Sequence, residues 1–364
     1  MPPHGIFSNI LSWVAANERK LGAALFAFGF LTDFFTFGIL PIGIVNYIFM
    51  GYLALAAVSA IGAHVFAPYH ESPIWWKKAL SVIFPLGAQY AFGGLLSGFV
   101  VFYTAHSVVL ASWPFLIFIA LIYIGNEYFR MYKQYLVFQT TLFFFTLYAY
   151  SIFGVPLVVG QLGPWIFLLS SVVAVLVFSA FLYVLYRANK ARFRESFRNI
   201  VRACAVMLMT VSGSYFLGVI PPIPLVMKDA GVYHSLVKLS EGYQVTEEAP
   251  RDWWDLRTPV VHHEIGTYLY AYSAIQAPTR FGSTVVHRWE RYDDTENDWI
   301  TVSKVAFPIS GGREGGYRGY SQKDAVPSGK WRVSVETANG QVIGRIRFDV
   351  ESTDVQPALY EKTL

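Results

Sequence analysis

The sequence predicts an α-helical polytopic membrane bundle of about seven spans, followed by a small all-β, antiparallel, sandwich-like C-terminal domain. Three observations predict this class. Long runs without charged residues fill most of residues 21–227, basic clusters separate those runs, and from about Gly266 apolar residues alternate with polar ones. A spanning helix needs about 20 apolar residues, and a period of two is typical of strands. The composition agrees, because 54% of the 364 residues are hydrophobic and 14% are charged.

The lengths of these runs set the number of spans. Residues 21–64, 79–126 and 134–186 are each long enough to cross a membrane twice, and residues 203–227 are long enough to cross once. Two, two, two and one crossings give seven. The turns inside the three long runs are expected near Pro41, at residues 104–107 and between Gly154 and Pro164.

Basic residues orient the bundle, because short loops rich in Lys and Arg stay on the cytoplasmic side of a membrane. The densest basic stretch, residues 187–202, is expected to be such a loop. Basic pairs before the first, third and fifth spans fall on the same side, and the opposite turns contain no Lys or Arg. We therefore expect the N-terminus in the cytoplasm and everything after Met227 outside it.

The change of period divides the chain into five parts. We expect a cytoplasmic or interfacial segment at residues 1–20, a transmembrane domain at 21–227, a linker at 228–265, a β domain at 266–351 and a tail at 352–364. Alternation marks strands at residues 268–272, 284–289, 299–307, 330–335 and 342–350. Asn339-Gly340, between the last two, is the strongest short signal for a hairpin.

Charge is divided unevenly between the two halves. Up to Lys228 the chain has 13 basic and 5 acidic residues, and from Asp229 onward it has 15 basic and 19 acidic residues. The negative tail argues against nucleic-acid binding. The excess of basic residues in the membrane half agrees with the predicted topology and with contacts to anionic lipid head groups of the bilayer. The single cysteine, Cys204, excludes a disulfide within the chain and a paired-cysteine metal site.

Polar residues within the predicted spans are candidates for function. Asp33 would lie near mid-membrane or in the outer half, where a carboxylate costs about 2.5–3.5 kcal/mol. It is either an ion, proton or ligand site, or a carboxyl group that is protonated or bonded to hydroxyls such as those of Thr32 or Thr36. Asn126, Glu127 and Arg130 stand at the inner end of the fourth span, where the spacing of the last two favours a local ion pair.

The β domain carries candidate ligand-binding side chains. His287 and Trp289 share one face of a predicted strand, while the residue between them faces the other way. A predicted Gly-rich loop adds Arg318, Ser321 and Lys323. Together these side chains suit an anionic or sugar ligand, with Trp289 or Trp331 as a stacking platform. In the alternative interpretation, the tryptophans are core residues and the loop arginines cap strand ends.

Metal and catalytic motifs are weak in this sequence. His262-His263-Glu264 has metal-ligand chemistry, but adjacent histidines on an extended chain point to opposite faces. A zinc site needs three or four ligands, so we expect no metal, and no motif indicates a cofactor. No Ser/His/Asp arrangement, phosphate loop or zinc-protease motif stands out.

Short motifs in both halves resemble those of a known family. In the tail they are Ala277-Pro278, Val286 to Trp289, Tyr317 to Lys323, Gly329 to Val333 and Gly344 to Phe348. In the membrane half they are Gly29 to Asp33, Gly93 to Ser97, Asn126-Glu127 with Arg130, and Pro221 to Tyr233. The chain thereby resembles a bacterial membrane family called domain of unknown function 2914, over about residues 266–351 of the tail. The resemblance implies a two-part architecture in a bacterial inner membrane, and it supplies no activity.

These observations favour a non-enzymatic membrane protein that presents its β domain outside the cytoplasm. That domain would bind a partner protein, glycan or lipid, as a scaffold or accessory subunit of an envelope complex. One alternative is a small transporter or sensor that uses Asp33. Another is a membrane enzyme acting on lipid or cell-wall precursors, although the scattered depths of the polar groups argue against a catalytic cavity.

Overall fold

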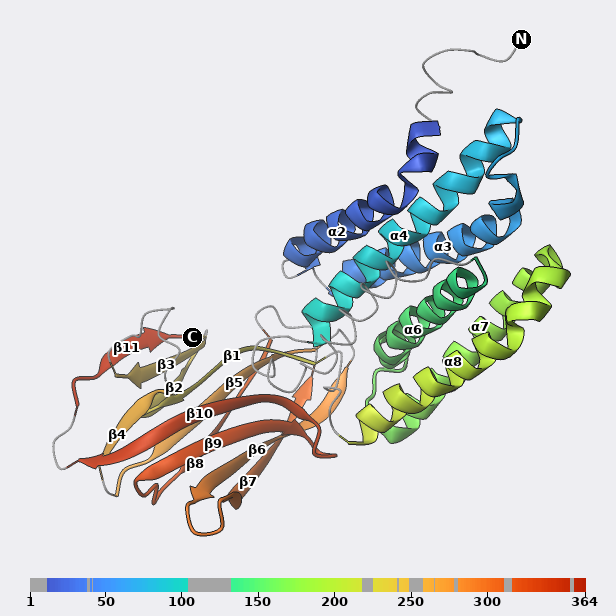
Figure 1. Cartoon of the computed structure of the whole chain (residues 1–364). Helices are drawn as coiled ribbons and strands as arrows, with labels where there is room; N and C mark the ends of the chain where they lie inside the picture. The colour runs from blue at the N-terminus through green and yellow to red at the C-terminus, as the bar shows by residue number, and fades with distance from the viewer. Residues whose placement is uncertain are drawn as a thin grey trace. The chain divides into compact units, whose positions relative to one another are not determined.

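The protein is described by a computed structural model that covers residues 12–37, 40, 42–103, 132–217, 225–240, 242–248, 258–264, 266–277, 281–310, 316–353 and 357–364. The chain divides into two compact units (Figure 1). The helical unit draws on residues up to 220, and the β unit contains residues 221–364.

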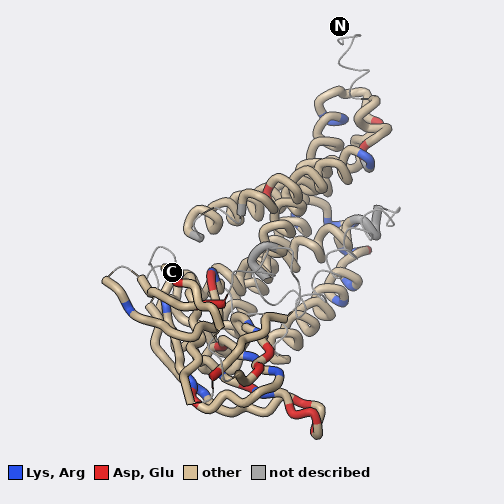
Figure 2. Tube along the Cα trace, turned by 90° about the vertical axis from the view of Figure 1, so that its left-hand side faces the viewer, with Lys and Arg blue, Asp and Glu red and all other residues tan. Residues whose placement is uncertain are grey.

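The long helices within the described residues are α2 (Glu18–Phe37), α3 (Ile42–Phe66), α4 (Trp75–Tyr103), α6 (Tyr132–Val159), α7 (Pro164–Ala188) and α8 (Lys190–Phe216). Within this described part of the chain, five stretches are long and apolar enough to cross a membrane: Gly43–Tyr69, Trp75–Val100, Leu136–Val159, Pro164–Ala188 and Lys190–Phe216. Long parts of the helical trace carry no charge (Figure 2). The predicted helical N-terminal half is confirmed. The number of seven spans stays a prediction, because α2 is not one of the five and residues 104–131 lie outside the described residues.

The basic stretch at residues 187–202 is helical, so the prediction of a loop there is wrong. α7 ends at Ala188 and α8 begins at Lys190, which leaves Asn189 alone to make the turn. Its side-chain oxygen accepts a hydrogen bond from the Arg192 backbone N–H at 3.3 Å and caps α8. Arginine, lysine and alanine are good helix formers, so the sequence after Asn189 favours a helix. The last apolar helix therefore starts at 190 rather than at 203.

The turn between α6 and α7 is shorter than the predicted stretch from Gly154 to Pro164. α6 continues through Gly154, and Pro164 is the first residue of α7. Gly160 and Gly163 have φ angles of 75° and 140°, a region that glycine adopts most easily, so the reversal is concentrated there. α2 and α3 are separate helices, as the turn expected near Pro41 requires, and the turn expected at 104–107 lies outside the described residues.

Glycines bring α2 and α4 into close contact. A Cβ on Gly93 of α4 would clash with the carbonyl oxygen of Phe26, and a Cβ on Gly29 of α2 would lie 3.0 Å from the carbonyl oxygen of Tyr90. Ser97 of α4 donates a hydrogen bond from Oγ to a backbone carbonyl of α2 at 2.7 Å. Small residues at such a seam let the two helix backbones approach closely.

A buried tyrosine of α6 links that helix to α7 and α8. The Tyr148 hydroxyl of α6 lies 2.7 Å from Ser171 Oγ of α7 and 3.1 Å from Ser212 Oγ of α8. Its ring is fully buried and packs near Phe144 and Phe167. A polar group that has its partners inside an apolar bundle fixes how the helices pack.

The strands of the β unit within the described residues are β1 (Val226–Tyr233), β2 (Ser235–Leu239), β3 (Gly242–Glu247), β4 (Val260–Glu264), β5 (Leu269–Gln276), β6 (Gly282–Asp293), β7 (Asp298–Ser310), β8 (Tyr317–Lys323), β9 (Gly329–Thr337), β10 (Val342–Thr353) and β11 (Tyr360–Thr363). They form three sheets with the orders β1-β5-β8, β4-β10-β9-β6-β7 and β11-β3-β2.

The sheet β1-β5-β8 contributes to a core on each of its two sides, and the larger core consists of two clusters, one around Ile275 and one around Ala271. Its side toward the five-stranded sheet buries apolar residues with that sheet, among them Ala271, Trp289, Trp331 and Phe348. The side toward β3 forms a smaller core of Tyr233, Val245, Tyr272 and Ala274. Because side chains alternate along a strand, consecutive residues of β5 enter different cores, and the strand is buried over most of its length.

The predicted strands of the β domain are confirmed as parts of β5, β6, β7, β9 and β10. The predicted hairpin is confirmed as well, since the Gly340 N–H donates to the Thr337 carbonyl at 2.9 Å and Gly340 has a φ of 80°. The domain is not a purely antiparallel sandwich, because β4 pairs in parallel with β10 and a third sheet is present.

The segment 228–265, expected to be a linker, forms most of β1 and all of β2 to β4. The tail at 352–364 likewise contains β11. These strands are short and mixed in polarity, and several pair with partners distant in sequence: β1 with β5, β4 with β10 and β3 with β11. A local pattern of apolar residues therefore does not mark them.

Candidate ligand-binding face of the β unit

Three predicted ligand-binding residues form a closed network in the core. His287 Nδ1 lies 2.9 Å from Ser321 Oγ, and its Nε2 lies 2.8 Å from Ser273 Oγ. Trp289 Nε1 donates to the same Ser321 Oγ at 2.9 Å. Burial lowers the pKa of His287 to about 3. His287 and Trp289 do share one face of β6, but both are 0% exposed, so this face is the interior of the unit.

The other predicted residues do not join them in an open site. The stretch with Arg318, Ser321 and Lys323 is the strand β8, paired with β5, and not a Gly-rich loop. Trp331 is 1% exposed and donates its indole N–H to a backbone carbonyl at 2.8 Å. Neither Trp289 nor Trp331 is therefore available as a stacking platform, and the interpretation of both as core residues is confirmed.

The opposite side of the five-stranded sheet carries a charged surface, here named the basic face. It consists of Arg288 and Glu290 of β6, Lys304 of β7, Arg332, Ser334 and Glu336 of β9, and Arg345 and Arg347 of β10. Strand pairing aligns them, because Glu290 stands opposite Arg332 and Arg288 stands opposite Ser334. Since side chains alternate along a strand, the burial of Trp289 and its neighbours in the core places these residues on the other side of the sheet. Glu290, Ser334 and Glu336 are buried there, whereas Lys304 and Arg347 are exposed.

Glu290 organises the centre of the basic face. Its carboxylate accepts hydrogen bonds from Arg332 Nε at 2.7 Å, Arg332 Nη2 at 2.9 Å and Ser334 Oγ at 2.8 Å. Burial pushes the pKa of Glu290 up, but the hydrogen bonds from Arg332 and Ser334 outweigh it and hold the pKa below its usual range. A bidentate arginine pair of this kind is among the stronger polar contacts in proteins. The ionised Glu290 is fully engaged within the face.

The basic face has more positive than negative groups. Arg288 Nη2 pairs with Glu336 Oε2 at 3.1 Å, so both carboxylates of the face already contact an arginine. Among the described residues, no carboxylate lies within ion-pair distance of Lys304, Arg345 or Arg347. Lys304 and Arg347 are exposed. Burial lowers the pKa of Arg345, and the neighbouring Arg332 acts in the same direction. The face therefore keeps positive charge that its own acids do not neutralise.

Aromatic rings border one end of the basic face. The Arg332 guanidinium carbon lies 4.3 Å from the centroid of Trp299, and Lys330 Nζ lies 5.5 Å from the centroid of Tyr292. The two rings lie edge to face, with centroids 5.3 Å apart. A cation over a ring is held by the ring's quadrupole. The arginine of this chain thus occupies one side of Trp299.

A histidine–carboxylate cluster lies beside β4. Glu248 accepts the His262 backbone N–H at 2.6 Å, and its oxygens lie 2.8 Å from His262 Nδ1 and 3.1 Å from His234 Nε2. The hydrogen bond to Glu248 raises the pKa of His262. Burial lowers the pKa of His263, which alternates to the other side of β4. No group of three or more His, Cys, Asp or Glu side chains that could hold a metal ion occurs in the described part of the chain.

Asp33 in the helical unit contacts a partner from another helix. The Tyr52 hydroxyl of α3 donates to Asp33 Oδ2 at 2.6 Å, and a Cβ on Gly94 of α4 would lie 2.6 Å from the same oxygen. The neighbouring Thr32 donates instead to a backbone carbonyl at 2.8 Å. The hydroxyl partner of Asp33 is therefore a tyrosine rather than a threonine. Asn126, Glu127 and Arg130 lie outside the described residues.

The histidine and tryptophans of β6 and β9 were predicted as a site, whereas the charged residues between them were not. The signal was present as charges at alternate positions, 288 and 290, 332 and 336, and 345 and 347. A strand with one apolar and one charged side turns the charged side to solvent in an antiparallel sheet. The alternation of charged and apolar residues was therefore enough to predict the basic face.

Comparisons with known proteins give a family for part of the chain. No curated protein matches it. A solved structure, the Pseudomonas fluorescens alkylpurine DNA glycosylase AlkC bound to DNA containing an abasic site analog, shares 10% sequence identity at a TM-score of 0.21. That alignment covers 95% of this chain and 100% of the other, and at this score it carries no argument. Residues 282–350, which include every residue of the basic face, match the family described as "Protein of unknown function (DUF2914)".

Proposed function

We propose that the chain is a non-enzymatic integral membrane protein of a bacterial inner membrane. It crosses the bilayer seven times, keeps its N-terminus in the cytoplasm and presents the β unit on the other side. There the basic face binds an acidic segment of a partner protein. The chain thereby acts as a scaffold or accessory subunit of an envelope complex.

The membrane part of the proposal is supported by the apolar helices and by where the charges fall. Five described helical stretches meet the length and polarity that a span requires. The junction of α7 and α8 carries Arg187, Lys190, Arg192 and Arg194, whereas the junction of α6 and α7 carries no Lys or Arg. This is the asymmetry that the positive-inside rule predicts for a helical hairpin whose α7–α8 end lies in the cytoplasm.

The observation that carries the binding function is the excess positive charge of the basic face. Lys304 and Arg347 are exposed, and Glu290 and Glu336 are already paired with arginines of the face. Guanidinium and ammonium groups without a carboxylate partner attract carboxylates, which arginine binds in a bidentate geometry. Complementary charge also accelerates the encounter of two proteins.

An acidic protein segment fits this surface better than a neutral sugar does. Sugar binding usually needs an open aromatic ring, and Trp289 and Trp331 are buried while Arg332 covers one side of Trp299. The groups that remain accessible are cationic. The experiment must therefore also measure binding of a glycan and of a lipid, so that a preference for either can be detected.

The test measures binding of a fluorescent oligoglutamate peptide to the full-length protein in lipid nanodiscs. We expect the variant with Lys304→Gln and Arg347→Gln to bind the peptide about tenfold more weakly, since it loses two cations at the surface. Both residues are exposed and neither bonds to Glu290, so the central network stays intact.

The matched control is Lys228→Gln with Lys238→Gln, which removes two exposed cations from β1 and β2. It should bind the peptide as the unmodified protein does. Equal losses in both double variants would mean that only net charge matters. Tighter binding of a neutral oligosaccharide or of anionic vesicles than of the peptide would contradict a protein partner.

A further inference from the structure

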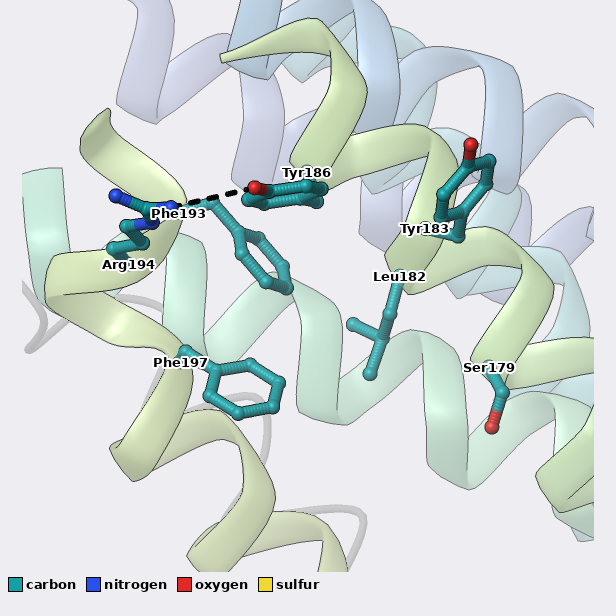
Figure 3. A pocket seen from close by; sticks show the side chains of 7 residues that line it. All are labelled: Ser179, Leu182, Tyr183, Tyr186, Phe193, Arg194 and Phe197. Carbon is teal, nitrogen blue, oxygen red and sulfur yellow. Dashed lines mark hydrogen bonds between the residues drawn. The ribbon is translucent and has the colours of Figure 1, made fainter. Parts of the chain in front are cut away.

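An open groove lies between α7 and α8, near the turn at Asn189 (Figure 3). α7 lines it with Ser179, Leu182, Tyr183 and Tyr186, and α8 lines it with Phe193, Arg194 and Phe197. Apart from the adjacent pairs Leu182-Tyr183 and Phe193-Arg194, the residues on each helix recur three or four apart, so each set occupies one broad helical face. The volume of ≈ 490 Å³ falls within the range of roughly 300–1,000 Å³ typical of small-molecule sites.

The groove is cationic at one end and apolar at the other. Near the turn, Arg194 Nη2 lies 3.5 Å from the Tyr186 hydroxyl, and Lys190 Nζ lies 5.7 Å from the centre of the Tyr186 ring. Figure 3 shows Tyr186 reaching from α7 toward Arg194. Farther from the turn the walls are Leu182 and Phe197, and Ser179 lies about 14 Å along α7 from its end. The Ser179 hydroxyl donates to its own helix at 2.7 Å.

We infer that this groove binds an anionic glycerophospholipid. The phosphate contacts Arg194, Lys190 and the Tyr186 hydroxyl, and one acyl chain lies along Leu182 and Phe197. The inference rests on the membrane-spanning part of the proposed function, and it assigns the inner leaflet as the source of the lipid.

Charge and polarity identify this ligand. Six basic residues and one acid occupy residues 187–202: Arg187, Lys190, Arg192, Arg194, Arg198 and Arg202 against Glu195. The start of α8 adds the positive end of a helix dipole. A free phosphate would use the cations but leave the apolar walls of the groove unused. A phospholipid has both kinds of surface, separated in the same direction as in the groove, and anionic head groups bind basic pockets between helices.

The experiment titrates full-length protein in detergent with phosphatidylglycerol and with phosphatidylcholine of the same chain length, and counts bound lipid by native mass spectrometry. We expect phosphatidylglycerol to bind more tightly. Arg194→Gln should weaken it about fivefold, the effect of one cation near a head group. Ser179→Trp, which fills the apolar end and keeps every charge, should weaken it as well. Lys20→Gln, an exposed cation on α2, should leave it unchanged.

Three results would overturn the lipid site: equal binding of the two lipids, equal losses in Arg194→Gln and Lys20→Gln, or displacement of the lipid by inorganic phosphate. If Arg194→Gln unfolds, Arg194→Lys must retain binding, and its failure would also count against the site. Membrane insertion is tested separately by topology reporters. Correct topology without lipid selectivity would reject this groove and leave the proposed function standing.

Discussion

His287 and Arg288 are adjacent residues of β6 with opposite surroundings. His287 is enclosed between two serines in the core, whereas Arg288 contacts Glu336 on the basic face. One peptide step along a strand is enough to move a side chain from one side of a sheet to the other. The chemistry of the basic face therefore depends on the apolar residues between its charges, which fix the register of the sheet.

Glu290 gives a test of the basic face at a single residue. Its side chain is 2% exposed and accepts three hydrogen bonds from Arg332 and Ser334. We expect Glu290→Gln to lower the free energy of unfolding of the β unit by about 2–4 kcal/mol, because Arg332 loses its paired charge. Urea titration, read by hydrogen exchange of β6 and β9 peptides, measures the change. Glu351→Gln, at a side chain 66% exposed, should change it by less than about 0.5 kcal/mol. Similar losses in the two variants would contradict this role of Glu290.

The buried His287 predicts that acid destabilises the β unit. Its pKa is about 3 in the folded protein and about 6.5 in an unfolded chain. Between these values the unfolded chain binds a proton that the folded protein does not, so the contribution is fully present above pH ~6.5 and is lost as the pH falls. The expected loss approaches about 1.4 kcal/mol per pH unit. Replacing the histidine by His287→Asn should reduce this slope, measured by urea unfolding at several pH values.

His262 serves as the contrasting control for that pH series. Hydrogen bonding to Glu248 raises its pKa, so its contribution is present below its unfolded pKa and is lost as the pH rises through the folded value. His262→Asn should therefore abolish the gain of stability as the pH falls toward ~6.5 and leave the slope below that pH unchanged, whereas His287→Asn should change only the slope below ~6.5. Equal slopes in the unmodified protein and in both variants would show that neither histidine is linked to folding.

The packing of α2 against α4 depends on glycines, which have no side chain. Gly93→Ala places a methyl group against the Phe26 carbonyl of α2. We expect it to destabilise the helical unit by about 1–3 kcal/mol, the usual effect of overpacking, because a backbone atom cannot rotate away. Thermal unfolding of the full-length protein in detergent measures this. Gly213→Ala on α8 meets nothing within 4 Å and should be neutral or slightly stabilising. Equal melting temperatures of Gly93→Ala and Gly213→Ala would contradict a stabilising role for the close contact between α2 and α4.

Some strands and helix ends could be predicted from the sequence and others could not. β9 and β10 could be predicted because their apolar residues alternate on both sides of Asn339-Gly340. β8 could not, because its buried positions include Gly319 and Ser321, which carry no apolar signal. A Cβ on Gly319 would clash with the ring of Phe307, so the small residue there is a packing requirement of the sheet. Asn189 ends one helix and caps the next. The many charged residues around it led to the wrong prediction of a loop.

The same limit applied to the candidate site. Alternation correctly placed His287 and Trp289 on one side of a strand, but period alone does not tell which side is the interior. That answer depends on β5 and β8, which cover the side of β6 with His287 and Trp289 through Ser273 and Ser321. For Asp33, the partner Tyr52 comes from α3, nineteen residues away, and no local spacing indicates it.

In the whole molecule, the proposed function places the helical unit in a membrane and gives the β unit an acidic partner. Presentation of the β unit outside the cytoplasm depends on an odd number of crossings, since only then do the N-terminus and the β unit lie in different compartments. The basic turn at Asn189 should share the compartment of the N-terminus. The basic face should be reachable from the other.

Paired topology reporters measure this most directly. Alkaline phosphatase, active only outside the cytoplasm, and green fluorescent protein, fluorescent only inside it, would each be joined through a flexible linker after Leu364, and in separate chains before Met1. Seven crossings predict active phosphatase and dark fluorescent protein after Leu364, with a fluorescent N-terminal fusion. A fluorescent fusion after Leu364 together with a fluorescent N-terminal fusion would mean an even number of crossings, and would contradict the presentation of the β unit outside the cytoplasm.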